Sequence, residues 1–201
     1  TITEGRPTVT DILPAANYEA ARLLSLAAAA EQGSEHPLGQ AIVRYARENG
    51  HAPGATEKFI AIAGQGIEAM IEGQSVLAGN RKLMADRGID LSGLAAEGDR
   101  LAGEGKTPMY IAAEGRALGL IAVADVVKPG SRAAIASLHQ MGIQVAMLTG
   151  DNQKTADAIA RQMGIDRVLA EVLPQDKADE VKKLQQEGRR VAMVGDGIND
   201  A

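Results

Sequence analysis

The stretch that most constrains the fold runs from residue 145 to the last residue, 201. It contains two short apolar runs, residues 145–148 and 191–194, and each run breaks into Gly and Asp. Short apolar runs bounded by turn residues are typical of buried strands in a parallel sheet. Helical patterns at 152–163 and 176–187 lie between the two runs. This order of elements predicts a doubly wound α/β fold.

Polar side chains follow both apolar runs. In sheets of this kind, ligands bind beyond the carboxyl ends of the strands. The polar residues expected at those ends are Thr149, Asp151, Asp196, Asn199 and Asp200. Carboxylates that converge on one point repel each other unless a cation lies among them, and oxygen ligands suit Mg²⁺ that bridges to a phosphate. The pattern therefore predicts a magnesium and phosphate site.

This part of the chain resembles the P-type ATPases, which have the haloacid-dehalogenase-like fold. The resemblance is carried by Thr149-Gly150-Asp151, by Pro174-Gln175-Asp176-Lys177 and by the stretch from Gly195 to Ala201. The first segment alone is weak evidence, because three residues recur by chance. The last segment is long enough to be specific. The order of the three segments along the chain makes the whole set more specific. The alternative is a generic Rossmann-like domain with acidic loop ends.

Composition limits the function classes. The chain has 201 residues, a net charge of −5, no Cys, no Trp and one Phe. The acidic balance argues against a nucleic-acid surface, and the lack of Cys excludes disulfides and thiolate metal sites. No apolar run approaches the roughly 20 residues of a membrane helix. We expect the chain by itself to be a soluble monomer with an aliphatic core.

A second domain is expected inside the first. Helical patterns at 18–31, with Asn17 as a possible cap, and at 37–48 precede alternating strand patterns and Gly-containing turns. These features predict an antiparallel α+β insert. The expected boundaries are 11–118 for this insert and 1–10 with 119–201 for the surrounding domain, and the resemblance to P-type ATPases implies that they are a nucleotide-binding domain and a truncated phosphorylation domain.

The insert resembles the nucleotide-binding domain of the heavy-metal-transporting branch. The matching residues are Glu31, Ser34, Glu35, His36, Gly64, Gly66 and Asn80. Alone, a His at a helix end is usually a surface residue, and two nearby Gly usually form a loop, although Gly does allow close approach to a ligand. The resemblance implies ATP binding, with His36 orienting the nucleotide, Glu31 near the adenine and Asn80 in support.

The resemblance also implies roles around the phosphate. Lys177 and Thr149 would contact phosphate oxygens, Asp196 would hold Mg²⁺ with support from Asp200, and Asp151 would face the nucleotide or order the hinge. Asn199 belongs to the same motif and is expected at the site. ATP and Mg²⁺ are the expected cofactors.

The first residues, Thr1-Ile2-Thr3-Glu4-Gly5, match a family segment that follows Asp-Lys-Thr-Gly, whose Asp accepts the phosphate. The chain is therefore expected to begin after that Asp and to be inactive alone. Its expected partners are the rest of a pump, namely membrane helices and an actuator domain, on the cytoplasmic side of a cell membrane.

The transported ion is the least constrained expectation. The motif set is most similar to Cu⁺ exporters, and exporters of Zn²⁺, Cd²⁺ or Pb²⁺ are the alternative. A soluble phosphatase of the same fold would share the phosphate-site motifs without needing this insert. A plain nucleotide-binding module would have the insert without the last motif.

Overall fold

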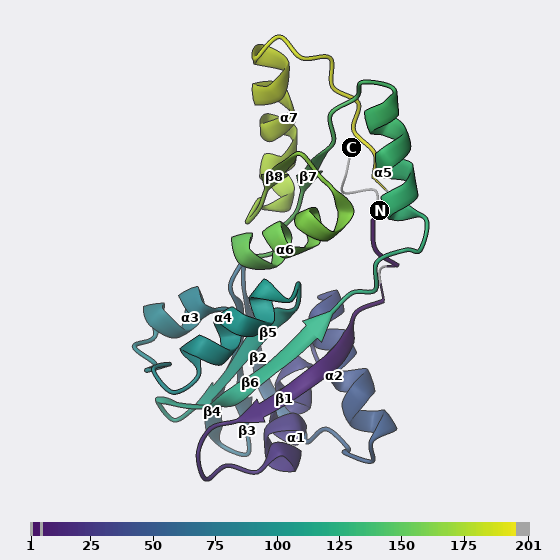
Figure 1. The fold of residues 1–201 in the computed structure, drawn as a ribbon. Coiled ribbons are helices and arrows are strands. Elements are labelled where there is room, and N and C mark those ends of the chain that lie inside the picture. Colours follow the sequence, from purple (N-terminus) through teal and green to yellow (C-terminus); the bar gives the residue numbers. More distant parts are fainter. Residues whose placement is uncertain (1, 5, 196–201) are drawn as a thin grey trace. The chain divides into compact units, whose positions relative to one another are not determined.

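The structure is a computed structural model that describes residues 2–4 and 6–195 (Figure 1). These residues form two compact units. The insert unit is described over residues 6–126 and the terminal unit over residues 2–4 and 127–195.

The insert unit is built on a six-stranded antiparallel sheet with the order β1-β6-β5-β4-β3-β2. Its strands are β1 (Thr8–Pro14), β2 (Thr56–Ile62), β3 (Gly66–Ile71), β4 (Gln74–Gly79), β5 (Thr107–Ala113) and β6 (Arg116–Ala124). Sequence-adjacent strands pair from β2 to β6. Short Gly-containing turns join β2 to β3, β3 to β4 and β5 to β6, whereas α3 and α4 lie between β4 and β5. The predicted antiparallel insert is confirmed.

Helices cover both faces of this sheet (Figure 1). The helices are α1 (Ala20–Glu31) and α2 (Pro37–Glu48) on one face and α3 (Arg81–Asp86) and α4 (Ala95–Gly103) on the other. Successive strand side chains point to opposite faces. Ile111 and Val123 accordingly pack with α1 and α2, whereas Tyr110 and Leu120 pack with α3 and α4.

Small side chains bring α1 close to its neighbours. Residues 27–30 are all Ala and are all buried. The prediction that Asn17 caps this helix was wrong. Asn17 instead has a left-handed backbone with φ 64°, and Glu19 precedes the helix without a side-chain cap. Asn tolerates that conformation better than most residues, so it serves the turn before the helix.

The terminal unit alternates helices with parallel strands, as the sequence predicts. Its elements are α5 (Ser131–Gln140), β7 (Ala146–Leu148), α6 (Gln153–Met163), β8 (Arg167–Leu169), the 3₁₀ helix η1 (Pro174–Asp176) and α7 (Lys177–Gln186). β7 and β8 pair in parallel through the α6 crossover. Met147, Ala156 and Ala160 form the buried centre of this unit.

The strand predicted at 191–194 does not form in the structure. Residues 191–195 have no regular secondary structure, and Met193 and Val194 are exposed. β7 and β8 are the strands of the sheet described in this unit, and this apolar run pairs with neither. An apolar run becomes a strand only where a neighbour supplies hydrogen bonds.

The division between the two compact units falls at other positions in the sequence than the predicted domain boundaries. Those boundaries, 10/11 and 118/119, fall within β1 and β6. The two strands pair with each other from Thr8↔Ala124 to Pro14↔Gly119, so both belong wholly to the insert unit. The division lies instead between residues 4 and 5 and between 126 and 127.

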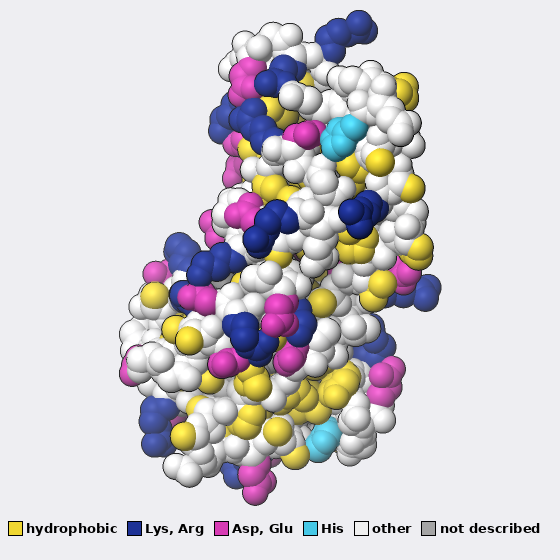
Figure 2. Space-filling model, viewed as in Figure 1, with side chains coloured by type: hydrophobic (Ala, Val, Ile, Leu, Met, Phe, Trp, Pro, Cys, Tyr) yellow, Lys and Arg dark blue, Asp and Glu magenta, His cyan; other side chains and the backbone are white. Residues whose placement is uncertain are grey.

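Charges of both signs mix on the surface. On the face drawn in Figure 2, Lys and Arg side chains alternate with Asp and Glu. Ion pairs of the insert unit include those of Lys106, which lies 2.9 Å from both Asp11 and Glu104, and of Arg87, which lies 2.6 Å from Glu68. Ion pairs that remain in contact with solvent contribute little stability individually, so the core carries the fold.

Gly119 provides a test of that core. A Cβ at this position would lie 2.6 Å from the Leu13 carbonyl oxygen and 2.5 Å from Leu23 Cδ2. We therefore expect Gly119→Ala to destabilise the insert unit by about 2 kcal/mol, because the backbone of β1 would have to move. All three Tyr residues, 18, 45 and 110, lie in the insert unit, so thermal melts followed by near-ultraviolet circular dichroism report on it.

Gly93→Ala is the matched control, because a Cβ at Gly93 meets nothing within 4 Å. An equal change in melting temperature in both variants would contradict the packing described for β1 and β6.

Candidate functional site

The turn between α1 and α2 holds three of the predicted nucleotide residues, Ser34, Glu35 and His36, and a fourth, Glu31, is the last residue of α1. His36 is the N-cap of α2, and its Nδ1 accepts a hydrogen bond from the Leu38 N–H at 3.3 Å. Pro37 follows at the first helical position, where its missing N–H costs nothing. The His36 N–H donates to Ser34 Oγ at 3.2 Å. His36 and Glu35 are exposed, so this turn presents an imidazole and a carboxylate at the surface.

Glu31 differs from its neighbours because it is buried, with 2% of its surface exposed. Its Oε2 lies 2.1 Å from the point that a Cβ on Gly39 would occupy, and Ser34 Oγ lies 3.0 Å from the same point. Burial raises the pKa of the Glu31 carboxyl to about 7, and a hydrogen bond with Ser34 opposes that shift. Burial disfavours the charged form of a carboxyl group, so Glu31 titrates near neutral pH.

Gly64, Gly66 and Asn80 form a second cluster, where the β2–β3 turn meets the start of α3. The Asn80 N–H donates to the Gln65 carbonyl at 2.8 Å, and Asn80 Nδ2 donates to the Gly64 carbonyl at 2.9 Å. Asn80 Oδ1 caps α3 by accepting from the Leu83 N–H at 3.0 Å. Asn80 therefore ties the glycine turn to the helix.

The glycines of this cluster have packing reasons as well. Gly64 has φ 69°, which is left-handed. A Cβ on Gly66 would lie 2.2 Å from the Ala78 carbonyl oxygen, and one on Gly79 would lie 2.3 Å from the Gln65 carbonyl oxygen. Close approach of two backbones is one of the uses of Gly in strands. A role for Gly64 and Gly66 in holding a nucleotide stays a prediction.

Strand β2 contacts the region of the α1–α2 turn and leads directly into the glycine turn. The Phe59 ring lies 3.3 Å from the point that a Cβ on Gly33 would occupy, beside the α1–α2 turn. Thr56 Oγ1 donates to the Ala29 carbonyl at 2.6 Å. β2 then ends at Ile62, directly before the glycine turn. The structure therefore brings Glu31, Ser34 and His36 together, and separately Gly64, Gly66 and Asn80.

In the terminal unit, Thr149 and Asp151 bind each other directly after β7. Thr149 Oγ1 donates to Asp151 Oδ2 at 2.9 Å and accepts from the Asp151 N–H at 3.1 Å. The Thr149 N–H donates to the Leu169 carbonyl, and the Val172 N–H donates to the Thr149 carbonyl. Asn152 caps α6 by accepting from the Thr155 N–H at 3.0 Å.

The remaining predicted phosphate-site residues are only partly described. Lys177 is half-buried at the first residue of α7. Asp196, Asn199 and Asp200 lie outside the described residues. Within residues 2–4 and 6–195, no three or more His, Asp and Glu side chains gather in a group suited to a metal ion.

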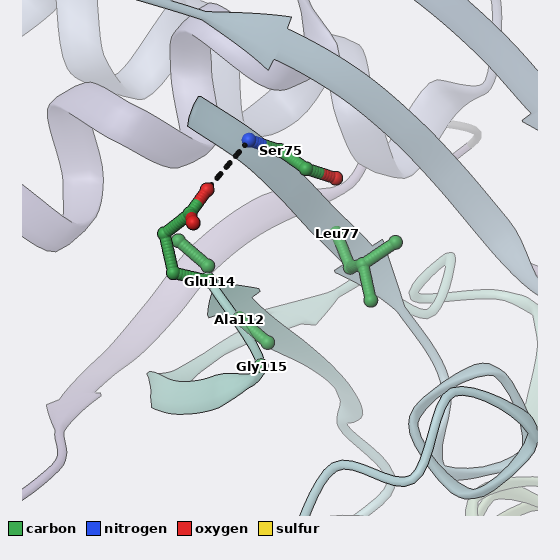
Figure 3. A pocket seen from close by; sticks show the side chains of 6 residues that line it. Ser75, Leu77, Ala112, Glu114 and Gly115 are labelled. Atoms are coloured by element: carbon green, nitrogen blue, oxygen red, sulfur yellow. Dashed lines mark hydrogen bonds between the residues drawn. The ribbon is translucent and has the colours of Figure 1, made fainter. Parts of the chain in front are cut away.

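A shallow depression of ≈ 260 Å³ lies away from the predicted site residues. It is near the start of β4, whereas Gly79 is the last residue of that strand. It is lined by Ser75, Leu77, Ala112, Ala113, Glu114 and Gly115, none of which was predicted as a site residue. Figure 3 shows the Glu114 carboxyl group turned toward Ser75, whose N–H donates to Glu114 Oε1 at 3.0 Å. The one carboxylate in its lining, that of Glu114, already accepts a hydrogen bond from Ser75. The depression therefore offers few groups for catalysis.

Gly39 is the residue that sequence reasoning missed at the α1–α2 turn. An isolated Gly inside a helical pattern often has a packing or functional reason, and this signal was available at a position that lies in the first turn of α2.

Comparison with known proteins assigns the family. The model of the haloacid dehalogenase-like hydrolases matches residues 1–201. The chain belongs to this family. This member is 48% identical over 201 residues to "Copper-transporting ATPase 2" of Rhizobium meliloti and 49% identical to "Copper-exporting P-type ATPase" of Bacillus subtilis. Both matches cover 100% of the chain but only 24% and 25% of the relatives, so the chain spans about a quarter of their length.

Solved structures agree with these relatives. A zinc-transporting PIB-type ATPase in the E2·Pi state is 40% identical with a TM-score of 0.66, covering 100% of this chain and 32% of that one. The catalytic domain of the CPx-ATPase CopB-B is 24% identical to this chain, with a TM-score of 0.73. The match covers 100% of this chain and 69% of the CopB-B chain. It shares the fold. The resemblance to P-type ATPases and the predicted fold class are confirmed. Among the described residues, no helix has both the length and the apolar character needed to cross a bilayer.

The buried Glu31 leads to a prediction about pH. Its folded pKa of about 7 exceeds the ordinary value of 4.5, so the folded state binds this proton more tightly than the unfolded state does. The associated stability is present below pH 4.5 and is lost as the pH rises through 7, a loss on the order of 3 kcal/mol. Urea unfolding at pH 5 and pH 8, followed by the Tyr signal, should show a fall that Glu31→Gln largely removes.

Glu35→Gln is the matched control, since Glu35 is exposed in the same turn. A wild-type pH dependence that survives unchanged in Glu31→Gln would show that another group is responsible.

Proposed function

We propose that the chain is the nucleotide-binding and phosphoryl-transfer part of a Cu⁺-exporting P-type ATPase. The observation that carries the proposal is its similarity, at 48% to 52% identity over its whole length, to proteins named as copper-transporting or copper-exporting ATPases. Its partners would be the membrane helices and actuator domain of the same pump, and it would work on the cytoplasmic side of the membrane.

The insert unit would bind ATP. Support comes from the α1–α2 turn, which is fixed by the hydrogen bonds of Ser34 and His36, and from the glycine turn that Asn80 holds. In both turns hydrogen bonds hold the backbone beside polar groups, and small-molecule sites are usually largely pre-formed in this way. The predicted nucleotide residues are Glu31, Ser34, Glu35, His36, Gly64, Gly66 and Asn80. Within this set, both polar atoms of the Asn80 side chain are used for support.

The terminal unit would carry the phosphoryl chemistry, with Thr149, Asp151, Lys177, Asp196, Asn199 and Asp200 as its residues. Phosphoryl transfer depends on positioning and charge stabilisation more than on covalent help. The Asp151 carboxylate accepts the Thr149 hydroxyl hydrogen, which suits a role in orienting Thr149. Lys177, at the start of α7, would contact phosphate oxygens.

Mg²⁺ would be held by Asp196, with Asp200 supporting it. Hard carboxylate oxygens are the ligands that this ion prefers, so the donor chemistry of these two side chains fits. When bound, the ion would offset phosphate charge.

Export of Zn²⁺, Cd²⁺ or Pb²⁺ is the second candidate. It is favoured by the 40% identity to the zinc-transporting structure, across the whole chain. ATP hydrolysis by the complete pump should rise with Cu⁺ under reducing conditions; stimulation by Zn²⁺ and not by Cu⁺ would favour the alternative. A soluble phosphatase of this fold is less well supported, because the similarity includes the insert unit.

The role of His36 can be tested by calorimetric titration of ATP. His36→Asn keeps a residue that caps helices well but removes the imidazole, and should weaken ATP binding about tenfold, the equivalent of one good hydrogen bond. Near-ultraviolet circular dichroism should remain unchanged. An ATP affinity equal to that of the wild type would remove His36 from the site.

Asp196 and Asp151 should behave differently in the complete pump. Asp196→Ala should abolish phosphoenzyme formation, because the proposed Mg²⁺ ligand is lost. Asp151→Ala should slow turnover while leaving the Mg²⁺ dependence of phosphorylation intact, because Asp151 binds Thr149. The measurement is acid-stable labelling by γ-labelled ATP over a range of Mg²⁺ concentrations. An equal loss of Mg²⁺ affinity in both variants would contradict the assignment.

A further inference from the structure

The chain passes into the insert unit between residues 4 and 5, and the segment that follows is held by two side chains. The Arg6 N–H donates to Asp125 Oδ1 at 3.0 Å, and Arg44 Nη2 donates to the Pro7 carbonyl at 2.6 Å. Pro7 is buried, whereas Arg44 is exposed. One of these side chains comes from directly after β6 and the other from α2.

These two contacts extend the hold on the chain beyond the sheet. The pairing of β1 with β6 begins where Thr8 lies opposite Ala124. Pro7 precedes that pair and has no N–H to donate, so its carbonyl is the main-chain group that it offers. The guanidinium of Arg44 makes the bond to this carbonyl charge-assisted, which is the stronger kind of hydrogen bond.

Arg44 belongs to the helix that also carries His36. His36 is the N-cap of α2, and Arg44 lies about two turns, or about 12 Å, further along the helix axis. Rigid secondary elements are among the structures that couple distant positions. One helix therefore bears a residue of the proposed nucleotide site near its start and the contact to the connecting segment near its end.

We propose that Arg44 is a positioning residue for phosphoryl transfer, because it joins the helix of the proposed nucleotide site to the segment that connects the two units. The proposal rests on the proposed function. ATP bound in the insert unit must be aligned with the phosphate residues of the terminal unit, and a misplacement of about 1 Å can cost on the order of a hundredfold in rate. Arg44 acts on this alignment through the Pro7 carbonyl.

The first arm of the test is phosphoenzyme formation by the complete pump. Arg44→Met keeps a long aliphatic side chain but removes the donor. At saturating ATP the rate should fall about tenfold, whereas the ATP concentration that gives half of the maximal rate should stay within about twofold of the wild type. A loss of ATP affinity with an unchanged maximal rate would overturn the proposal.

Two further variants separate the contact from the charge of the helix. Arg44→Lys keeps a charged donor, and the contact uses one nitrogen, so the rate should recover to within about threefold of the wild type. Arg47→Met is the matched control, because Arg47 is exposed in the last turn of the same helix. Its rate should equal that of the wild type. A fall as large as that of Arg44→Met would overturn the role of the Pro7 contact.

The last arm does not depend on ATP. The Pro7 carbonyl and the Thr8 nitrogen share one peptide bond, so loss of the Arg44 contact should shift the Thr8 amide ¹⁵N resonance of the chain. Arg47→Met should leave that resonance unchanged. An unchanged Thr8 resonance in Arg44→Met would overturn the contact itself.

The outcomes also separate this proposal from the proposed function. If the wild-type pump forms no phosphoenzyme from ATP, the proposed function fails and the positioning role fails with it. If the wild type is phosphorylated and Arg44→Met matches its rate while the Thr8 resonance shifts, the positioning role alone fails.

Discussion

Burial of β5 and β6 on both faces is the constraint on which the insert unit depends. Their side chains alternate between a core with α1 and α2 and a core with α3 and α4. Aliphatic residues and Ala fill both cores, with Tyr110 as the largest side chain buried fully. Because helices pack on both faces of the sheet, the ends of these helices and strands are held in place. The turns that begin at those ends are held in place as well. The α1–α2 turn and the glycine turn are two such turns.

Close backbone approach gives these turns their shape. Gly39 admits the Glu31 carboxyl, while Gly66 and Gly79 allow the β2–β3 turn to contact the end of β4. Asn80 then joins that turn to α3 by bonds from both its main chain and its side chain. The candidate site therefore includes three positions, Gly39, Gly66 and Gly79, where a larger residue would not fit.

Local patterns were sufficient to predict much of this fold. The helices predicted at 37–48 and 152–163 and the antiparallel hairpins of the insert each follow from short-range chemistry. The strand at 191–194 was not predicted correctly, because pairing depends on a neighbour that local sequence does not reveal. Asn17 was misjudged for a related reason: Asn suits both a cap and a left-handed turn.

The candidate site was predicted unevenly from the sequence. Motif residues were found through the resemblance, but the burial of Glu31 and the contact with Gly39 depend on how two helices pack, and sequence spacing does not report that. The grouping of Asp196, Asn199 and Asp200 remains a prediction.

The central claim is that the α1–α2 turn and the glycine turn together bind an adenine nucleotide. The most direct measurement is a titration of the ¹⁵N-labelled chain with ATP, followed by amide chemical shifts. Our account predicts saturable changes concentrated at residues 31–39, 64–66 and 79–80. Changes confined to the depression lined by Ser75 and Glu114, or no saturable change at all, would contradict it.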